Sequence, residues 1–79
     1  MQTKEIEFKG QKFEVLDAAG DDFFVLRATI KAKDDPMAIF DAYDIVFQGK
    51  TEEYAEKLGR SFELVNELYS LAIGDEAKN

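Results

Sequence analysis

Hydrophobic and charged residues alternate along residues 4–16 of the chain. Ile6 and Phe8 are separated by charged residues, and Phe13 and Val15 are separated by Glu14. A period of two is typical of a β-strand with one buried face. The pattern predicts an N-terminal β-hairpin over about residues 4–16.

The turn between the two strands is expected at residues 10–11, because Gly at the first loop position suits a type II′ turn. In that register Phe8 faces Phe13 and Ile6 faces Val15, so one face of the hairpin becomes wholly apolar. An isolated hairpin is only marginally stable in water. We therefore expect helices to cover this face.

The segment over about 22–33 fits two alternatives, a helix or a third strand. Its Phe, Val, Thr and Ile residues have strand propensity, whereas Phe23, Leu26 and Ile30 share one helical face. Two aspartates lie at its start and two lysines near its end. This distribution complements the helix dipole and favours the helix.

Capping residues in the second half of the chain indicate three further helices, expected over about 36–48, 52–58 and 62–73. Asp35 is the expected N-cap of the first helix, with Pro36 at its first position, where a missing N–H costs nothing. Gly49 is placed to end this helix in a left-handed conformation. Thr51 and Ser61 are the expected N-caps of the two helices that follow.

The apolar spacing of these helices predicts which faces point inward. On the first, the apolar face consists of Ile39, Phe40, Tyr43, Val46 and Phe47; on the second, of Tyr54, Ala55 and Leu58; on the last, of Phe62, Val65, Leu68, Tyr69 and Ala72. The whole pattern predicts an α+β fold, a hairpin packed on three to four short helices. We expect one domain over 1–79, with a frayed polar tail at 74–79.

Aromatic residues are abundant for a chain of 79 residues, with seven Phe and three Tyr. At helical spacing such residues are typical of a core, but aromatic enrichment also marks protein-binding surfaces. Four short helices and a hairpin leave room for both interpretations. The candidate partner-binding residues are Phe40, Tyr43, Phe47, Phe62 and Tyr69.

Histidine and cysteine are absent, which excludes His-based acid–base catalysis, cysteine nucleophiles and His- or Cys-ligated zinc. The glycine spacing matches no phosphate-binding loop. The paired acids at 21–22 and 34–35 are explained by helix starts. We therefore expect no catalytic, metal or cofactor site, and a protein that is not an enzyme.

Seventeen acidic and ten basic residues give a net charge of −7, which repels nucleic acids and anionic membranes. No apolar run has the length of a membrane span, and the N-terminal residues have no signal-peptide pattern. These observations predict a cytoplasmic protein that binds other proteins. They are also compatible with a homo-oligomer.

The sequence resembles the small tail assembly chaperones of long-tailed bacteriophages and prophages of Gram-positive hosts. The resemblance rests on the hairpin segment KEIEFKGQKFEV at 4–15, the helix start DDP at 34–36, the short linker around Gly49, and the capped final helix. It implies a cytoplasmic, non-enzymatic protein that binds the tape measure protein, keeps it soluble, recruits tail tube subunits and is absent from the mature virion. The alternative that the charge leaves open is an acidic adaptor or inhibitor acting on another protein surface.

Overall fold

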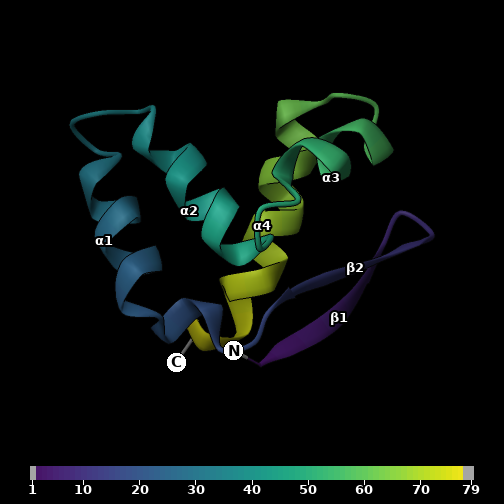
Figure 1. Cartoon of the computed structure of the whole chain (residues 1–79), viewed down its shortest axis with the longest axis horizontal. Coiled ribbons are helices and arrows are strands. Elements are labelled where there is room, and N and C mark those ends of the chain that lie inside the picture. Colours follow the sequence, from purple (N-terminus) through teal and green to yellow (C-terminus); the bar gives the residue numbers. More distant parts are fainter. Residues whose placement is uncertain (1, 78–79) are drawn as a thin grey trace.

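The computed structural model describes the backbone of residues 2–77 and the side chains of residues 2–74. Within these residues an antiparallel hairpin is followed by a 3-10 turn and four α-helices (Figure 1), which confirms the predicted α+β fold. The elements in chain order are β1 (Thr3–Phe8), β2 (Gln11–Leu16), η1 (Ala19–Asp21), α1 (Phe23–Lys31), α2 (Ala38–Val46), α3 (Thr51–Lys57) and α4 (Phe62–Ala77).

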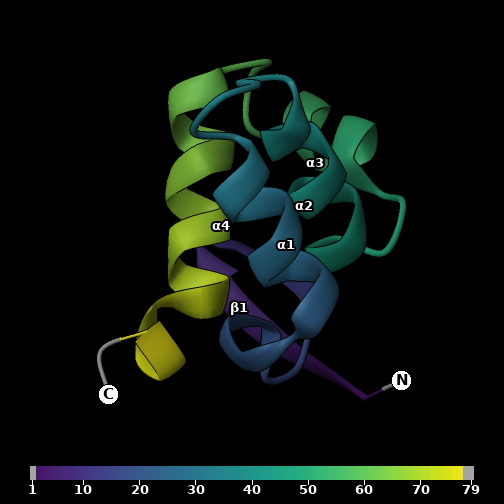
Figure 2. The ribbon, with the colours of Figure 1, turned by 90° about the vertical axis from the view of Figure 1, so that its left-hand side faces the viewer.

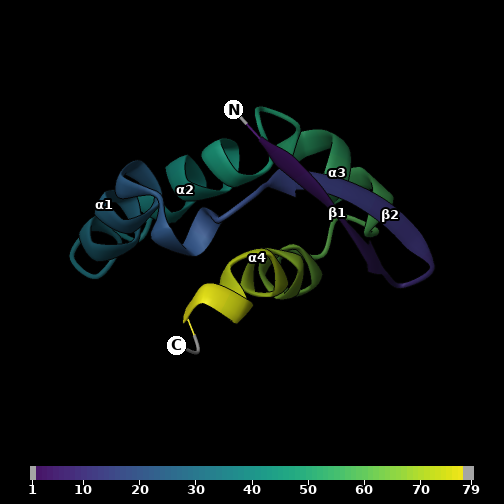
Figure 3. The same ribbon diagram turned by 90° about the horizontal axis from the view of Figure 1, so that it is seen from below.

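The first three helices form a row, with the hairpin at the α3 end and α1 at the other end (Figures 1 and 3). Helix α4 lies on one side of this row (Figures 2 and 3), where it contacts α2, α3 and η1. The arrangement buries the inner faces of α2, α3 and α4 together and leaves the outer side of α1 at the margin of the molecule.

The hairpin forms as predicted, but the predicted register is wrong by two residues. Ile6 faces Phe13, and Phe8 faces Gln11, because the turn consists of Lys9 and Gly10 rather than residues 10–11. Both turn residues have positive φ, 55° and 76°, as a type I′ turn requires, and this turn matches the twist of the strands. The observed register places Glu7 opposite Lys12, an attractive pair, and Glu5 opposite Glu14, a repulsive one.

Residues 23–31 form helix α1, so the helical alternative is confirmed over the strand. The Asp22 carboxylate accepts hydrogen bonds from the backbone N–H groups of Phe24 and Val25, at 2.9 and 3.0 Å. These bonds satisfy two of the free donors at the helix start. Lys31 in the last turn completes the favourable charge distribution.

Helix α2 begins two residues later than predicted. Asp35 and Pro36 belong to a turn closed by i to i+3 bonds, in which the Ala38 N–H donates to the Asp35 carbonyl at 2.9 Å. The Asp35 carboxylate accepts only a longer bond, 3.3 Å, from the Met37 N–H. The helix also ends two residues earlier than predicted, at Val46. Gln48 is the first left-handed residue after it, with φ of 57°, and Gly49 follows with φ of 81°.

Of the two remaining predicted N-caps, Thr51 is wrong and Ser61 is confirmed. Thr51 is not the N-cap of α3, because the helix begins with the bond from the Tyr54 N–H to the Lys50 carbonyl. Its hydroxyl instead donates to the carboxylate of Asp44 on α2, at 2.6 Å. Ser61 caps α4 as predicted, since its Oγ accepts from the Leu64 N–H at 3.2 Å.

A continuous hydrophobic core joins the hairpin to all four helices of the described chain. Its largest fully buried side chains are Tyr43, Phe13, Phe47, Leu68, Val15, Val25 and Val46. Most of the predicted inward faces of α2, α3 and α4 belong to it or pack against it. Phe40 and Phe62 are the exceptions, because they are 41% and 57% exposed, and the prediction that they point inward is wrong.

Helix α4 continues past its expected end at residue 73 to Ala77. Gly74 is accommodated inside the helix, at the usual cost of about 1 kcal/mol for a glycine in that setting. The expected frayed tail thus overlaps the helix at 74–77, and its last two residues, 78 and 79, lie outside the described residues.

Candidate functional site

The five candidate aromatic residues divide into a buried group and an exposed pair. Tyr43, Phe47 and Tyr69 are almost completely buried, whereas Phe40 is 41% exposed and Phe62 is 57% exposed. Both interpretations of the aromatic residues therefore apply, each to a different part of the set. The buried three belong to the core, and the exposed two remain available to a partner.

The exposed pair rests directly on the buried group. The ring centroids of Phe40 and Phe62 are 6.2 Å apart, and each lies about as far from the ring of Tyr43, at 5.8 and 6.1 Å. Tyr43 in turn packs on Phe47 and on Tyr69, at 5.8 and 4.9 Å. The contacts are mostly edge-to-face, the favourable arrangement for aromatic rings, so the core fixes the position of the exposed pair.

A pocket of about 250 Å³ lies beside this pair, where α2, α3 and α4 meet. Most of its lining is apolar. The residues that line it are Phe40 and Tyr43 of α2, Thr51 and Ala55 of α3, Arg60 and Ser61 of the connecting loop, and Phe62 and Val65 of α4. We call this the aromatic pocket.

The polar groups around the aromatic pocket already have partners inside the chain. The Arg60 guanidinium binds Glu56 through two nitrogens, each 3.0 Å from the same carboxylate oxygen. Ser61 caps α4, and Thr51 donates to Asp44. The pocket therefore offers a partner mainly apolar surface, with a neutralised cation at its edge.

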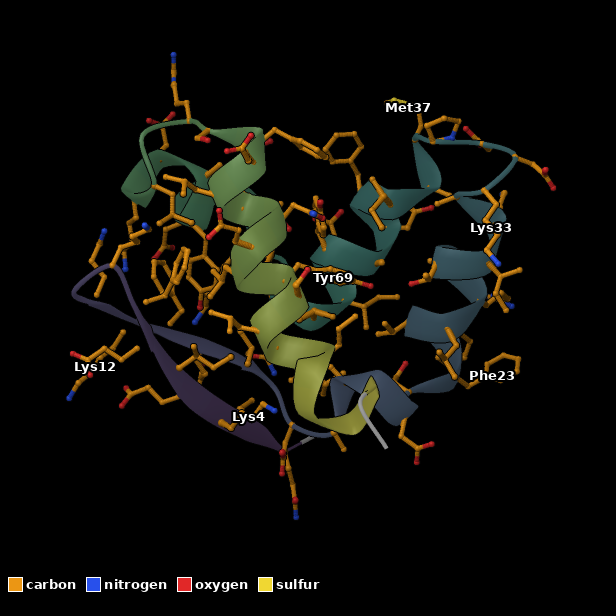
Figure 4. All side chains as sticks on the ribbon, turned by 180° about the vertical axis from the view of Figure 1, so that it is seen from behind. Lys4, Lys12, Phe23, Lys33, Met37 and Tyr69 are labelled. Carbon is orange, nitrogen blue, oxygen red and sulfur yellow. The ribbon has the colours of Figure 1, made fainter. Side chains whose placement is uncertain are left out.

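Tyr43 keeps the inner wall of the pocket uncharged. Its hydroxyl donates a 2.7 Å hydrogen bond to the Asn66 side-chain oxygen on α4. Burial, and secondarily the neighbouring Tyr69, raises the pKa of Tyr43 to about 12. Tyr69 belongs to α4, and its side chain points towards the helices behind α4 in Figure 4. Its hydroxyl shares a 3.0 Å hydrogen bond with Thr29 of α1.

Sequence reasoning identified three of the residues of the aromatic pocket as candidates and missed the contribution of α3 and the loop. Ala55 was recognised only as part of an inward face, and Thr51 and Ser61 only as caps. Arg60 follows Gly59 and itself has a φ of 64°. Nothing in its position along the sequence indicates that it lies beside Phe40 and Phe62. Only the meeting of α2, α3 and α4 in the folded chain brings these residues together.

A second, wider pocket of about 610 Å³ lies between α1 and α2. Charged residues of both signs line it, among them Asp22, Arg27, Lys31 and Asp41. The Arg27 guanidinium lies over the ring of Phe24, 5.0 Å from its centroid, a favourable cation–π distance. None of the five candidate residues lines this pocket.

Two further observations concern metal binding and membrane spans. Within the described residues, no three carboxylate, histidine or cysteine side chains gather as ligands for a metal ion. None of the described helices is long and apolar enough to cross a membrane.

Comparisons of this chain with known protein families, curated proteins and solved structures find no significant match.

Proposed function

We propose that this chain is a non-enzymatic binding protein that takes up apolar side chains of a partner protein in the aromatic pocket. The observation that supports this best is the exposed pair Phe40 and Phe62, held by a buried aromatic cluster beside an apolar pocket. Rigid aromatic residues next to a pocket are the usual anchors of protein interfaces.

The size of the pocket suits side chains rather than a large ligand. A cavity of about 150 Å³ is enough for benzene, so about 250 Å³ accommodates one bulky side chain with space around it. An amphipathic helix inserts such side chains from one face at three- and four-residue intervals. The proposed partner segment is therefore an amphipathic helix with an aliphatic or aromatic anchor.

We further propose that the partner is a tape measure protein and that the chain is a tail assembly chaperone. This identity rests on the resemblance described above, together with the apolar pocket. The role would be to cover an apolar stripe of a long helical polypeptide, keep it soluble and recruit tail tube subunits. It would take place in the cytoplasm of the bacterial host, and the chain would be absent from the mature virion.

The net charge of −7 is compatible with this role. A strongly charged surface keeps a complex soluble while one apolar patch is covered. Charges at the edge of an interface affect orientation and association rate more than affinity. Because Glu56 already neutralises Arg60, we expect binding at the aromatic pocket to depend little on salt.

Co-expression with the tape measure protein of the same phage tests the proposal. We expect the chain to raise the soluble yield of that protein and to co-purify with it. Phe40→Ser and Phe62→Ser are expected to reduce capture, whereas Leu71→Ser, which changes an exposed residue of α4 outside the pocket, is the matched control and is expected to retain it.

Two results would refute the proposal. In one, the tape measure protein stays insoluble and no complex forms. In the other, the chain binds a basic enzyme in a strongly salt-sensitive way, which would instead support the acidic inhibitor. If capture occurs but all three serine variants behave alike, the chaperone role stands and the aromatic pocket is the wrong surface.

A further inference from the structure

Helix α1 presents an apolar face that the rest of the described chain leaves open. Phe23 is 66% exposed, Leu26 46% and Ile30 62%, and their spacing of three and four residues places them on one side of the helix. Val25 and Ala28 on the other side are buried in the core. Figure 4 shows Phe23 at the outer margin of the molecule, on the side of α1 away from α4.

This open face is large enough to be a binding surface. The ring of Phe23 packs edge-to-face on that of Phe24, at 5.2 Å, and the Arg27 guanidinium lies 5.7 Å from the Phe23 ring centroid. Because a whole aromatic side chain contributes 150–250 Å², the exposed parts of this face amount to roughly 300–400 Å². Patches of this size on a monomer are often functional.

The charge of α1 differs from that of the other described helices. Helix α1 contains Arg27 and Lys31 and no acidic residue, whereas acidic residues outnumber basic ones in α2, α3 and α4. Two copies of a chain with net charge −7 repel each other over most of their surfaces. A contact made through α1 keeps the acidic helices α2, α3 and α4 of the two copies away from the interface.

The pattern along α1 is also self-complementary. When a second copy is rotated about a two-fold axis that passes near Leu26, the two Leu26 side chains meet, and Phe23 lies opposite the partner's Ile30. The aspartates at 21–22 then approach the partner's lysines at 31 and 33, because the two helices are antiparallel. Antiparallel helices also place unlike ends of their dipoles together.

From the open face, its charge and its two-fold pattern, we infer that the chain forms a symmetric homodimer through antiparallel α1 helices. An interface of this type presents the same patch on both copies. Its area per copy is below the roughly 800 Å² of a standard interface, so the dimer exchanges readily with the monomer. The aromatic pocket contains no residue of α1, so each copy keeps its pocket accessible.

Sedimentation velocity of the wild-type chain, from about ten micromolar to about one millimolar, tests the inference. We expect the mean mass to rise from that of the monomer towards that of the dimer. Leu26→Glu places two carboxylates beside the axis and is expected to weaken the dimer at least tenfold. Leu71→Glu, an exposed change on α4, is expected to have no such effect. A monomer at every concentration would overturn the inference.

Cysteine cross-linking tests the antiparallel geometry, because the natural chain contains no cysteine. Under mild oxidation Leu26→Cys is expected to form a covalent dimer at least tenfold faster than the control Phe62→Cys. A mixture of Phe23→Cys and Ile30→Cys chains is expected to cross-link faster than either chain alone. Equal rates for Leu26→Cys and Phe62→Cys, or self-linking of Phe23→Cys that matches the mixture, would overturn the proposed interface.

Discussion

The hydroxyl group of Tyr54 on α3 donates a 2.7 Å hydrogen bond to the backbone carbonyl of Glu14 on β2. The Tyr54 ring also packs edge-to-face on that of Phe13, with centroids 5.0 Å apart. Tyr54 thus joins the hairpin to the helices by one polar and one apolar contact. The hairpin is held against α3, which forms one wall of the aromatic pocket.

Removing the Tyr54 hydroxyl tests this connection. We expect Tyr54→Phe to lower the free energy of unfolding by about 0.5–1.5 kcal/mol, the usual value for one hydrogen bond, while the ring contact with Phe13 remains. Urea unfolding followed by circular dichroism measures the change. A midpoint equal to that of the wild type would mean that the bond to Glu14 contributes nothing to stability.

The apolar part of the connection contributes more. Phe13 is fully buried, so Phe13→Ala is expected to cost on the order of 3–5 kcal/mol, a large share of the stability of so small a domain. The same change at Phe8, which is only partly buried and pairs with Gln11, is expected to cost less. Comparable losses at both positions, measured by urea unfolding, would contradict the observed register.

The helix caps separate into those that bind backbone N–H groups and one that does not. Asp22→Ala and Ser61→Ala are each expected to cost about 1 kcal/mol, because each side chain accepts a bond from a helix start. Thr51→Ala removes only an exposed bond to a side chain and is expected to cost within about 0.5 kcal/mol. Thermal melts rank the three variants, and a Thr51 loss equal to the other two would restore its role as a cap.

Alkaline pH is expected to unfold the domain through its tyrosines. Burial raises the pKa of Tyr43 to about 12, and it also raises the pKa of Tyr54 and of Tyr69 above the ordinary value of 10.0. Above pH 10 the unfolded chain loses these protons more readily, so stability is complete below pH 10 and falls as pH rises towards 12.

Urea midpoints between pH 8 and 12, read together with the phenolate absorbance, measure this loss. Tyr43→Phe is expected to show a shallower decline than the wild type, since it lacks the group whose pKa is most clearly raised. Ordinary titration of all three tyrosines near pH 10 in a chain that stays folded would contradict the burial of their hydroxyl groups.

The sequence predicted the elements better than their exact pairing. Alternation along the hairpin has a period of two, so a shift of two residues keeps the same side chains on the apolar face. The correct register depended on whether Gly10 is the first or the second residue of the turn, and the positive φ of Lys9 settles this. The Asp35 and Thr51 caps were misplaced because each side chain bonds elsewhere, Asp35 to the Met37 N–H within a turn and Thr51 to Asp44 of α2.

The candidate site was predicted in part. Helical spacing grouped Phe40, Tyr43 and Phe62 with the core, but it does not show where a neighbouring helix stops covering a face. Phe40 and Phe62 lie at the margins of their apolar faces, beyond the cover that α3 provides. On α1 the buried residues are the smaller ones, Val25 and Ala28. That choice depends on the packing of α1 against α2, which spacing alone does not specify.

The most direct test of the account is the dissociation constant of the purified complex with the tape measure protein, measured by calorimetry for matched variants. We expect Phe62→Ala to weaken binding by about 30-fold, the equivalent of the roughly 2 kcal/mol of a central aromatic anchor. Leu71→Ala is expected to leave the constant within about twofold of the wild type. Equal constants for the two variants would contradict the claim that the aromatic pocket holds the partner.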